Sequence, residues 1–155
     1  MRGEQLQAPE MVTVVLDTNI LISALVGHGN PKRLVLRLLE EETIVSSMEM
    51  LAELADVLSR KKFAEVKSLQ VNSFLSKFAR RVVVVTLKRH FKIVEEDPDD
   101  DIVLSTAYFG RAWYIISGDK HLLKREEFRG IKIVTAKHML ELLRKGGEVR
   151  FRIKS

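Results

Sequence analysis

The sequence predicts an α/β protein, a three-layer α/β/α sandwich around a mostly parallel central sheet of four or five strands. Short β-branched runs alternate along the chain with segments whose apolar residues recur at helical spacing, which is typical of a parallel sheet covered by helices. The 155 residues fit one domain, and no repeat or linker divides them. Hydrophobic residues make up 46% and charged residues 30%, a composition that indicates a globular protein rather than a disordered one.

Capping residues and periodicity define the elements of the first half. Asp17 or Thr18 caps the first helix, Pro31 suits the start of the second, and Ser46 or Ser47 caps the third. In order, we expect a strand at 12–16, helices at 18–26 and 31–42, a strand at 43–45, a helix after the serines with Leu51, Leu54, Ala55 and Leu58 on one face, and a helical stretch at 63–79.

The second half continues the alternation. Four successive valines at 82–85 predict a buried parallel strand. We then expect irregular structure at 87–98, a helix at 99–110, a strand at 113–116, a short helix around 121–124, a strand at 131–134 and a helix at 136–145. The predicted organisation is a flexible leader at 1–10, one domain at 11–145 and a basic tail at 146–155.

Several classes of protein are excluded by composition. The chain has no cysteine, which rules out disulfides, thiolate metal sites and a cysteine nucleophile, and suits the cytoplasm. The apolar stretch at 12–26 contains Asp17 and Asn19 and is too short to cross a bilayer, and residues 1–10 lack the apolar core of a signal peptide. A formal charge of +5 is compatible with a polyanionic partner.

Acidic residues gather where the predicted strands end. Asp17 directly follows the first strand, and Asp119 follows the strand at 113–116 after a two-residue turn. A third group of acids lies at the start of the helix predicted at 99–110, which enters from the same side of the sheet. These acids are Asp97, Asp99, Asp100 and Asp101. Glu53, in the second turn of its helix, can point into the same crevice. Parallel α/β sheets bind ligands beyond the carboxyl ends of their strands.

Each acid also has a purely structural interpretation. Asp17 and Asp119 suit helix caps or turns, the Asp run suits a helix N-terminus, and Glu53 suits a solvated helix face. Together, however, such carboxylates would repel one another unless a cation neutralised them. Without cysteine or a His pair, an all-oxygen site suits Mg²⁺ or Mn²⁺ rather than zinc. Such sites hydrolyse phosphodiesters with one or two ions.

Four short motifs resemble those of the PIN-domain family. They are Val14-Val15-Leu16-Asp17-Thr18-Asn19, Ser47 through Glu53-Leu54 to Leu58, Asp97-Pro98-Asp99-Asp100-Asp101, and Ile116-Ser117-Gly118-Asp119-Lys120. The resemblance covers residues 11–145 and is strongest to the toxin components called VapC-like. By it, the catalytic and metal-binding acids are Asp17, Glu53, Asp100 and Asp119, with Asp101 as the alternative to Asp100, and Asn19 and Ser117 are supporting polar residues.

The resemblance also implies a function. VapC-like proteins have a sheet of five parallel strands, depend on Mg²⁺ or Mn²⁺, and cleave single-stranded RNA; they are usually homodimers neutralised by an antitoxin protein. Basic residues that suit the RNA backbone here are Arg60, Lys61, Lys62 and Lys120, for which solvated surface charge is the simpler interpretation.

Two other functions remain to be weighed. A catalytically inactive PIN-like module that binds RNA or protein would keep the fold without the chemistry. A phosphatase that uses Asp17 as nucleophile, as in the haloacid-dehalogenase-like enzymes, would require a second Asp where this chain has Asn19, and is therefore disfavoured.

Overall fold

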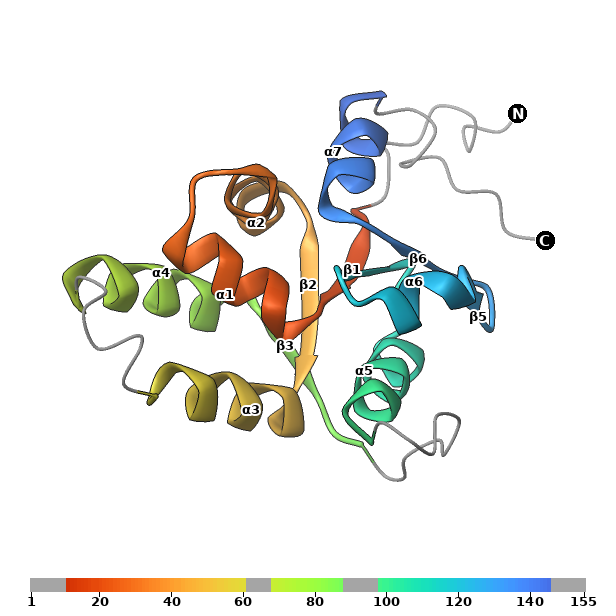
Figure 1. Cartoon of the computed structure of the whole chain (residues 1–155), viewed down its shortest axis with the longest axis horizontal. Helices are drawn as coiled ribbons and strands as arrows, with labels where there is room; N and C mark the ends of the chain where they lie inside the picture. Colours follow the sequence, from red (N-terminus) through yellow and green to blue (C-terminus); the bar gives the residue numbers. More distant parts are fainter. Residues whose placement is uncertain (1–10, 61–67, 88–97, 146–155) are drawn as a thin grey trace, which may run out of the picture.

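The structure, a computed structural model, describes residues 11–60, 68–87 and 98–145 (Figure 1). Its strands are β1 (Thr13–Leu16), β2 (Thr43–Ser47), β3 (Val83–Val85), β4 (Tyr114–Ile116), β5 (Glu127–Phe128) and β6 (Ile131–Val134). Its helices are α1 (Thr18–Val26), α2 (Asn30–Glu41), α3 (Met48–Leu58), α4 (Ser68–Arg81), α5 (Pro98–Phe109), α6 (Lys120–Arg125) and α7 (Ala136–Lys145). The predicted alternation of strands and helices is confirmed.

The strands form one sheet in the order β3-β2-β1-β4-β6-β5. Five of them run parallel, and the predicted mostly parallel sheet is confirmed. The sixth, β5, pairs antiparallel with β6 and was not expected from the sequence. Arg129 and Gly130 connect β5 and β6 with positive φ angles of 50° and 85°. Positive φ at both central residues is the requirement of the tightest hairpin turns, which explains how so short a strand can form.

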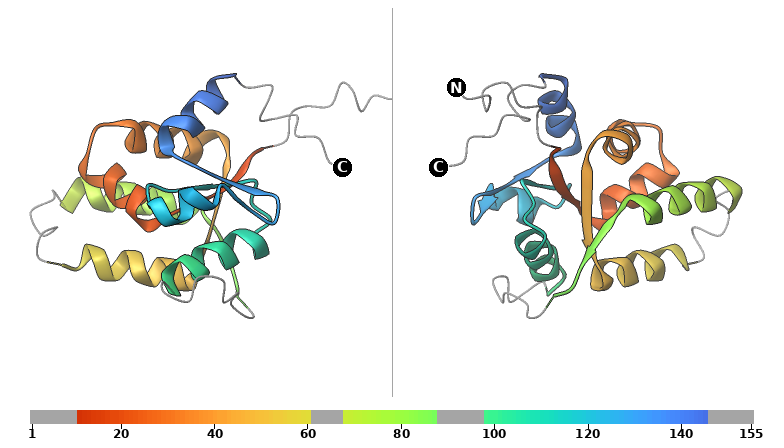
Figure 2. Two further views of the ribbon diagram at one scale, coloured as in Figure 1. Left: turned by 45° about the vertical axis from the view of Figure 1, so that its right-hand side comes forward. Right: turned by 180° about the vertical axis from the view of Figure 1, so that it is seen from behind.

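Helices cover both faces of the sheet, as the sandwich prediction requires. Along β1, Val14 and Leu16 belong to a core cluster shared with α1, α2 and α7, whereas Val15 belongs to a second cluster with α5 and α6. Side chains of a strand alternate between its two faces, so each face needs its own cover. Figure 2 shows α5 on the opposite side of the sheet from α2 and α7.

The valine run forms a parallel strand, but the expectation that it is buried is wrong. Val83 is 48% exposed and Val84 is 44% exposed. The reason is topological, because within the described residues β3 is an edge strand of the sheet, paired with β2 on one side.

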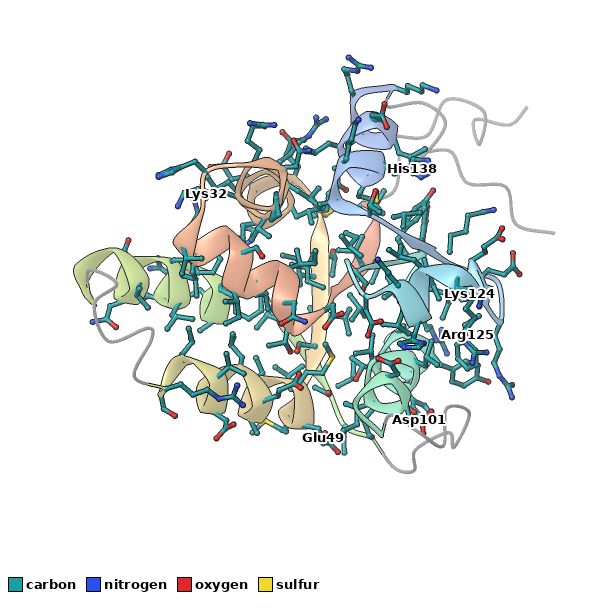
Figure 3. All side chains as sticks on the ribbon, in the orientation of Figure 1. Lys32, Glu49, Asp101, Lys124, Arg125 and His138 are labelled. Carbon is teal, nitrogen blue, oxygen red and sulfur yellow. The ribbon has the colours of Figure 1, made fainter. Side chains whose placement is uncertain are left out.

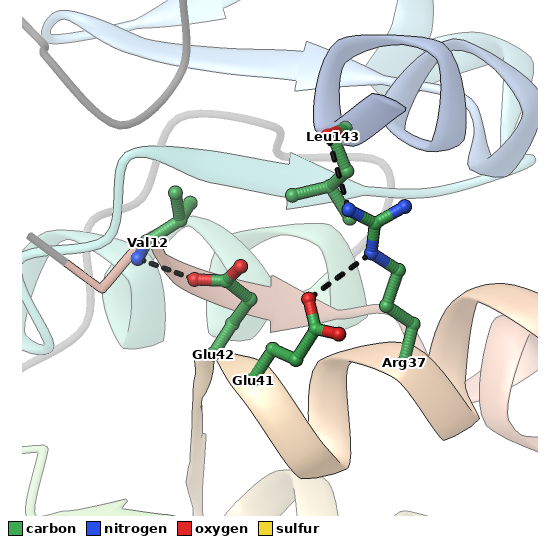
Figure 4. A network of polar contacts seen from close by, with 5 residues as sticks. All are labelled: Val12, Arg37, Glu41, Glu42 and Leu143. Carbon is green, nitrogen blue, oxygen red and sulfur yellow. Dashed lines mark hydrogen bonds and ion pairs between the residues drawn. The ribbon is translucent and has the colours of Figure 1, made fainter. Parts of the chain in front are cut away.

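Polar contacts tie α2 to its neighbours (Figure 4). Glu42, 3% exposed, accepts a hydrogen bond of 2.8 Å from the backbone N–H of Val12, just before β1. Arg37 donates through Nη2 to the carbonyl oxygen of Leu143 in α7, at 3.0 Å, and its Nε lies 3.3 Å from Oε1 of Glu41. Side chains therefore connect α2 to the start of the sheet and to α7.

Some predictions lie outside the described residues. They are the leader at 1–10, the tail at 146–155, Lys61 and Lys62, the first part of the helix expected at 63–79, and Asp97 with most of the loop expected at 87–98. Within the described ranges, no helix is long and apolar enough to span a membrane.

Candidate functional site

The centre of the candidate site lies where β1 and β4 end. These parallel strands are neighbours, with Leu16 opposite Ile116, so the residues that follow them meet. The backbone N–H of Asp17 donates to the carbonyl oxygen of Ile116 at 3.0 Å. The hydroxyl of Ser117 donates to Oδ2 of Asp17 at 2.7 Å, and both side chains are buried. The sheet therefore sets the position of Asp17 through backbone and side-chain contacts.

Asp119 reaches the same point from the N-cap position of α6. Its backbone N–H donates to Oγ of Ser117 at 2.9 Å, and its Oδ1 accepts from the backbone N–H of His121 at 2.8 Å. The capping role that the sequence allowed for Asp119 is real. Capping does not separate Asp119 from the site, because Oγ of Ser117 contacts both the carboxylate of Asp17 and the backbone N–H of Asp119.

Burial raises the pKa of Asp17 above its ordinary value. The hydrogen bond from Ser117 and the backbone N–H groups of Asn19 and Thr18 oppose this rise, and the negative charge of Asp119 adds to it. The net effect is a carboxylate that is costly to ionise where it stands. A cation beside Asp17 and Asp119 would remove that cost, and their oxygens are the ligands that Mg²⁺ and Mn²⁺ prefer. The residues present therefore fit a hard divalent ion.

Glu53 is held by a residue that the sequence offered only as a helix cap. Thr18, at the start of α1, donates through Oγ1 to Oε1 of Glu53 at 2.6 Å. Thr18 is 4% exposed, so water has little access to compete for this hydrogen bond. Since Thr18 directly follows Asp17, this contact links Glu53 in α3 to the acid at the end of β1. The sequence signal that could have predicted this contact is the hydroxyl residue Thr18 directly after Asp17.

Asp100 and Asp101 are both buried in the first turn of α5, at 4% and 7% exposure. Burial therefore does not choose between them. A cavity of about 30 Å³ between α3 and α5 is lined by Glu53 and Val103, among others. Ile102 and Val103 of α5 both line this cavity, whereas neither Asp100 nor Asp101 does. The cavity therefore does not choose between the two acids, and Asp100, with Asp101 as its alternative, stays a prediction.

Glu49 is a second acid in this part of the site. It is half-buried and lines the same cavity as Glu53, one helical turn earlier in α3. Figure 3 shows Glu49 at the start of α3 and Asp101 at the start of α5, at one end of the molecule. The sequence predictions do not include Glu49, although its spacing of four residues from Glu53 places both acids on one face of the helix.

The structure brings the predicted acids together in part. Asp17 and Asp119 share Ser117, and Glu53 approaches α5 and the start of α1. In the part of the chain that is described, however, no group of three or more His, Cys, Asp or Glu residues is arranged to hold a metal ion. The four predicted acids, Asp17, Glu53, Asp100 and Asp119, are therefore not all close enough in this conformation to bind one metal ion.

The supporting and basic residues lie around this centre. Asn19 is exposed, and its backbone N–H rather than its side chain acts on Asp17. Lys120 is exposed at the start of α6, next to Asp119. Arg60 is exposed beyond α3, where its Nη2 lies 3.4 Å from Oδ2 of Asp56, as in a surface ion pair. Of these, Lys120 is the cation directly adjacent to the acids in sequence.

Comparisons with known proteins agree with the fold described above. Two solved structures share the fold. One is VapBC2 from Rickettsia felis, bound to a DNA fragment from its promoter. The match has a TM-score of 0.56 and 21% identity, and it covers 80% of this chain and 98% of that chain. The other is PAE2754 from Pyrobaculum aerophilum, with a TM-score of 0.59 and 14% identity, covering 87% of this chain and 90% of that chain.

The family is shown by sequence. An uncharacterized protein of Methanocaldococcus jannaschii, MJ1680, is 31% identical over 127 residues, which cover 79% of this chain and 81% of that protein. The PIN domain, a fold whose members are generally nucleases, matches residues 13–121, which include Asp17, Glu53, Asp100 and Asp119. The chain belongs to the PIN-domain family.

Proposed function

We propose that this protein is a divalent-metal-dependent endoribonuclease that hydrolyses phosphodiester bonds of single-stranded RNA. The observation that carries the proposal is the pairing of buried Asp17 with Asp119 through Ser117 at the carboxyl ends of β1 and β4. Family membership supports the nuclease class. A buried Asp17 with a raised pKa, beside the partly exposed Asp119, is the kind of site that a cation stabilises and that helix capping alone does not require.

In this proposal Asp17, Glu53, Asp100 and Asp119 hold Mg²⁺ or Mn²⁺, with Asp101 as the alternative to Asp100. When bound, the metal supplies a water of lowered pKa and offsets the charge of the scissile phosphate. The chain contributes the positions of the acids. Ser117 orients Asp17 and the turn that carries Asp119, and Thr18 orients the carboxylate of Glu53.

Basic residues next to the acids would hold the RNA strand. Lys120 is exposed beside Asp119, and Arg60 is exposed at the end of the helix that carries Glu53. We include Lys61 and Lys62, which follow Arg60 in the sequence. Contacts of this kind bind phosphates without reading sequence, so they predict salt-sensitive cleavage of many RNAs.

The test is incubation with mixed single-stranded RNAs in Mn²⁺ or in EDTA. We expect cleavage only with the metal, and a loss of at least about 100-fold in Asp17→Asn and in Asp119→Asn, since each removes a charged ligand. Glu40→Gln is the charge-matched control, because Glu40 is an exposed acid of α2 outside the site. Full activity in either site variant would refute the assignment.

The choice within the Asp run has its own test. Asp100→Asn and Asp101→Asn remove neighbouring buried acids from the same helical turn. We expect Asp100→Asn to abolish cleavage and Asp101→Asn to retain a measurable part of it. The opposite order would make Asp101 the ligand.

We further propose that the protein is the toxin of a toxin-antitoxin pair, acting as a homodimer in the cytoplasm. The fold shared with VapBC2 and the absence of cysteine support this. Expression of the chain alone should arrest growth, and co-expression of a small neighbouring reading frame should relieve the arrest. Growth unaffected by an active enzyme would argue against the toxin role while leaving the nuclease intact.

A second candidate function is a catalytically inactive PIN-like module that binds RNA or protein. It is favoured by one observation, that three or more acids do not form a metal-binding group within the described residues. Tight RNA binding with no cleavage in Mn²⁺, unchanged by Asp17→Asn, would select this function.

A further inference from the structure

A groove between α2 and α7 lies apart from the acid cluster. Its volume is about 380 Å³, within the range of small-ligand sites. The two helices contact each other and lie together at the top of Figure 1, whereas α3 and α5, which carry Glu53 and Asp100, lie at the bottom. The groove shares no lining residue with the proposed nuclease centre.

Positive charge dominates the lining of this groove. Four of its lining side chains are cations: Arg33, Arg37, Lys137 and Arg144. Among the described residues of the lining, one is an acid, Glu141, and one is apolar, Leu140. Like charges that converge on a depression repel each other, and an anion placed between them relieves that repulsion. The groove is therefore suited to a ligand with more than one negative charge.

Two of the arginines make side-chain contacts. Arg37 donates to the carbonyl oxygen of Leu143 across the groove, at 3.0 Å, as Figure 4 shows, and its Nε pairs with Glu41 at 3.3 Å. Arg33 is exposed and donates to Oδ1 of Asn30 on the same helix. A guanidinium has five N–H donors in a rigid fork, so these contacts leave donors for a ligand.

We propose that the α2/α7 groove binds the phosphodiester backbone of an RNA strand. The choice of RNA rests on the ribonuclease function proposed above. Planar guanidinium forks match phosphate oxygens, and repeated phosphates match several cations in a row. The cations of α2 and α7 give the groove a positive charge that a polyanionic strand complements.

The groove would act as a second anchoring point for the substrate. A strand long enough to contact both the groove and the acid cluster gains affinity from both, whereas a strand of a few nucleotides contacts only one. The groove therefore assigns this protein a preference for longer single strands that the acids alone do not predict.

The test separates binding from cleavage. A fluorescent single-stranded RNA of about 30 nucleotides is titrated in EDTA with Asp17→Asn protein, so that neither metal nor catalysis is involved. The groove variant adds Arg33→Gln, Lys137→Gln and Arg144→Gln. The control variant instead adds Arg80→Gln, Arg81→Gln and Lys132→Gln, which are exposed cations outside the groove. Arg37 is left intact because it also joins the helices.

We expect the groove variant to bind RNA at least about tenfold more weakly and to lower the slope of log affinity against log salt by roughly two, for three lost phosphate contacts. The control variant should change affinity by less than about twofold. Equal melting temperatures establish that both variants fold. Because the experiment measures RNA affinity and not cleavage, its result can be interpreted even if the protein proves not to be a nuclease.

Two results would overturn the proposal. One is an affinity and salt slope of the groove variant equal to those of the control variant. The other is displacement of the RNA from the unsubstituted groove by polyglutamate as effectively as by unlabelled RNA, which would mean that the groove binds acidic chains in general.

Discussion

Replacement of Ser117 by alanine tests the centre of the site directly. The Ser117 side chain is fully buried, its hydroxyl donates to Asp17 at 2.7 Å, and its oxygen accepts from the N–H of Asp119 at 2.9 Å. The substitution removes both hydrogen bonds at a position where the side chain is fully buried. It changes no charge, so its effect reports on these two contacts alone.

The expected loss is large for one oxygen atom. A hydrogen bond to a charged group contributes about 1.5–3 kcal/mol, and loss of the acceptor of a partly buried N–H costs roughly 1 kcal/mol more. Together the free energy of unfolding should fall by about 2.5–4 kcal/mol. For a chain of this size each kcal/mol lowers the melting temperature by about 2–4 °C, so we expect a decrease of roughly 5–15 °C.

The loss should also depend on pH. The pKa of Asp17 is raised in the folded protein, so the folded state binds its proton more tightly than the unfolded state does. The contribution of Asp17 to the free energy of unfolding is therefore greatest below its ordinary pKa of 3.8 and falls as pH rises through the raised pKa. Ser117 opposes this rise, so Ser117→Ala should steepen the fall, and its cost should shrink at acidic pH, where Asp17 is neutral.

Thermal melts from pH 4 to pH 7 measure both effects. Ser59→Ala is the matched control, since it removes the same atom from an exposed serine whose hydroxyl donates to the carbonyl oxygen of Asp56 at 2.6 Å. The control should change the free energy of unfolding by no more than about 0.5 kcal/mol. The reasoning is refuted if Ser117→Ala is no more destabilising than Ser59→Ala, or if its cost is independent of pH.

Three further predictions address single contacts. In EDTA at neutral pH, Asp17→Asn should melt at a higher temperature than the unsubstituted protein, because it removes a buried carboxylate whose pKa is raised, and the difference should vanish towards pH 4. Mn²⁺ at about 100 times its dissociation constant should stabilise the unsubstituted protein by about 2.7 kcal/mol and leave the variant unchanged. A variant that melts at a lower temperature throughout would contradict this prediction. Thr18→Val should lower cleavage by freeing the carboxylate of Glu53, and Thr18→Ser should retain it; equal rates in the two variants would remove the positioning role. Glu42→Ala should cost about 1–3 kcal/mol in urea unfolding because it leaves a buried N–H without its acceptor, whereas Glu40→Ala, at an exposed acid, should be nearly neutral; equal costs would refute the role of burial.

Local pattern predicted most of the fold. The strand at 131–134 and the helices at 18–26 and 136–145 have the predicted bounds, and Ser47 caps α3 through a hydrogen bond from the N–H of Met50. These features depend on nearest neighbours along the chain, namely apolar periodicity and caps. Where pairing across the sheet matters, the prediction was poorer: the valines of β3 are exposed and β5 was not foreseen.

The sequence by itself determined the α/β alternation, the family motifs and the acids at the strand ends, because each is written in consecutive residues. Only the tertiary structure decided which side chains meet. It joined Asp17 to Asp119 through Ser117, 100 residues away from Asp17, and Thr18 to Glu53 across two helices. It also placed the cations of α2 beside those of α7. Such contacts depend on how elements pack, and packing depends on the whole chain rather than on any local run of it.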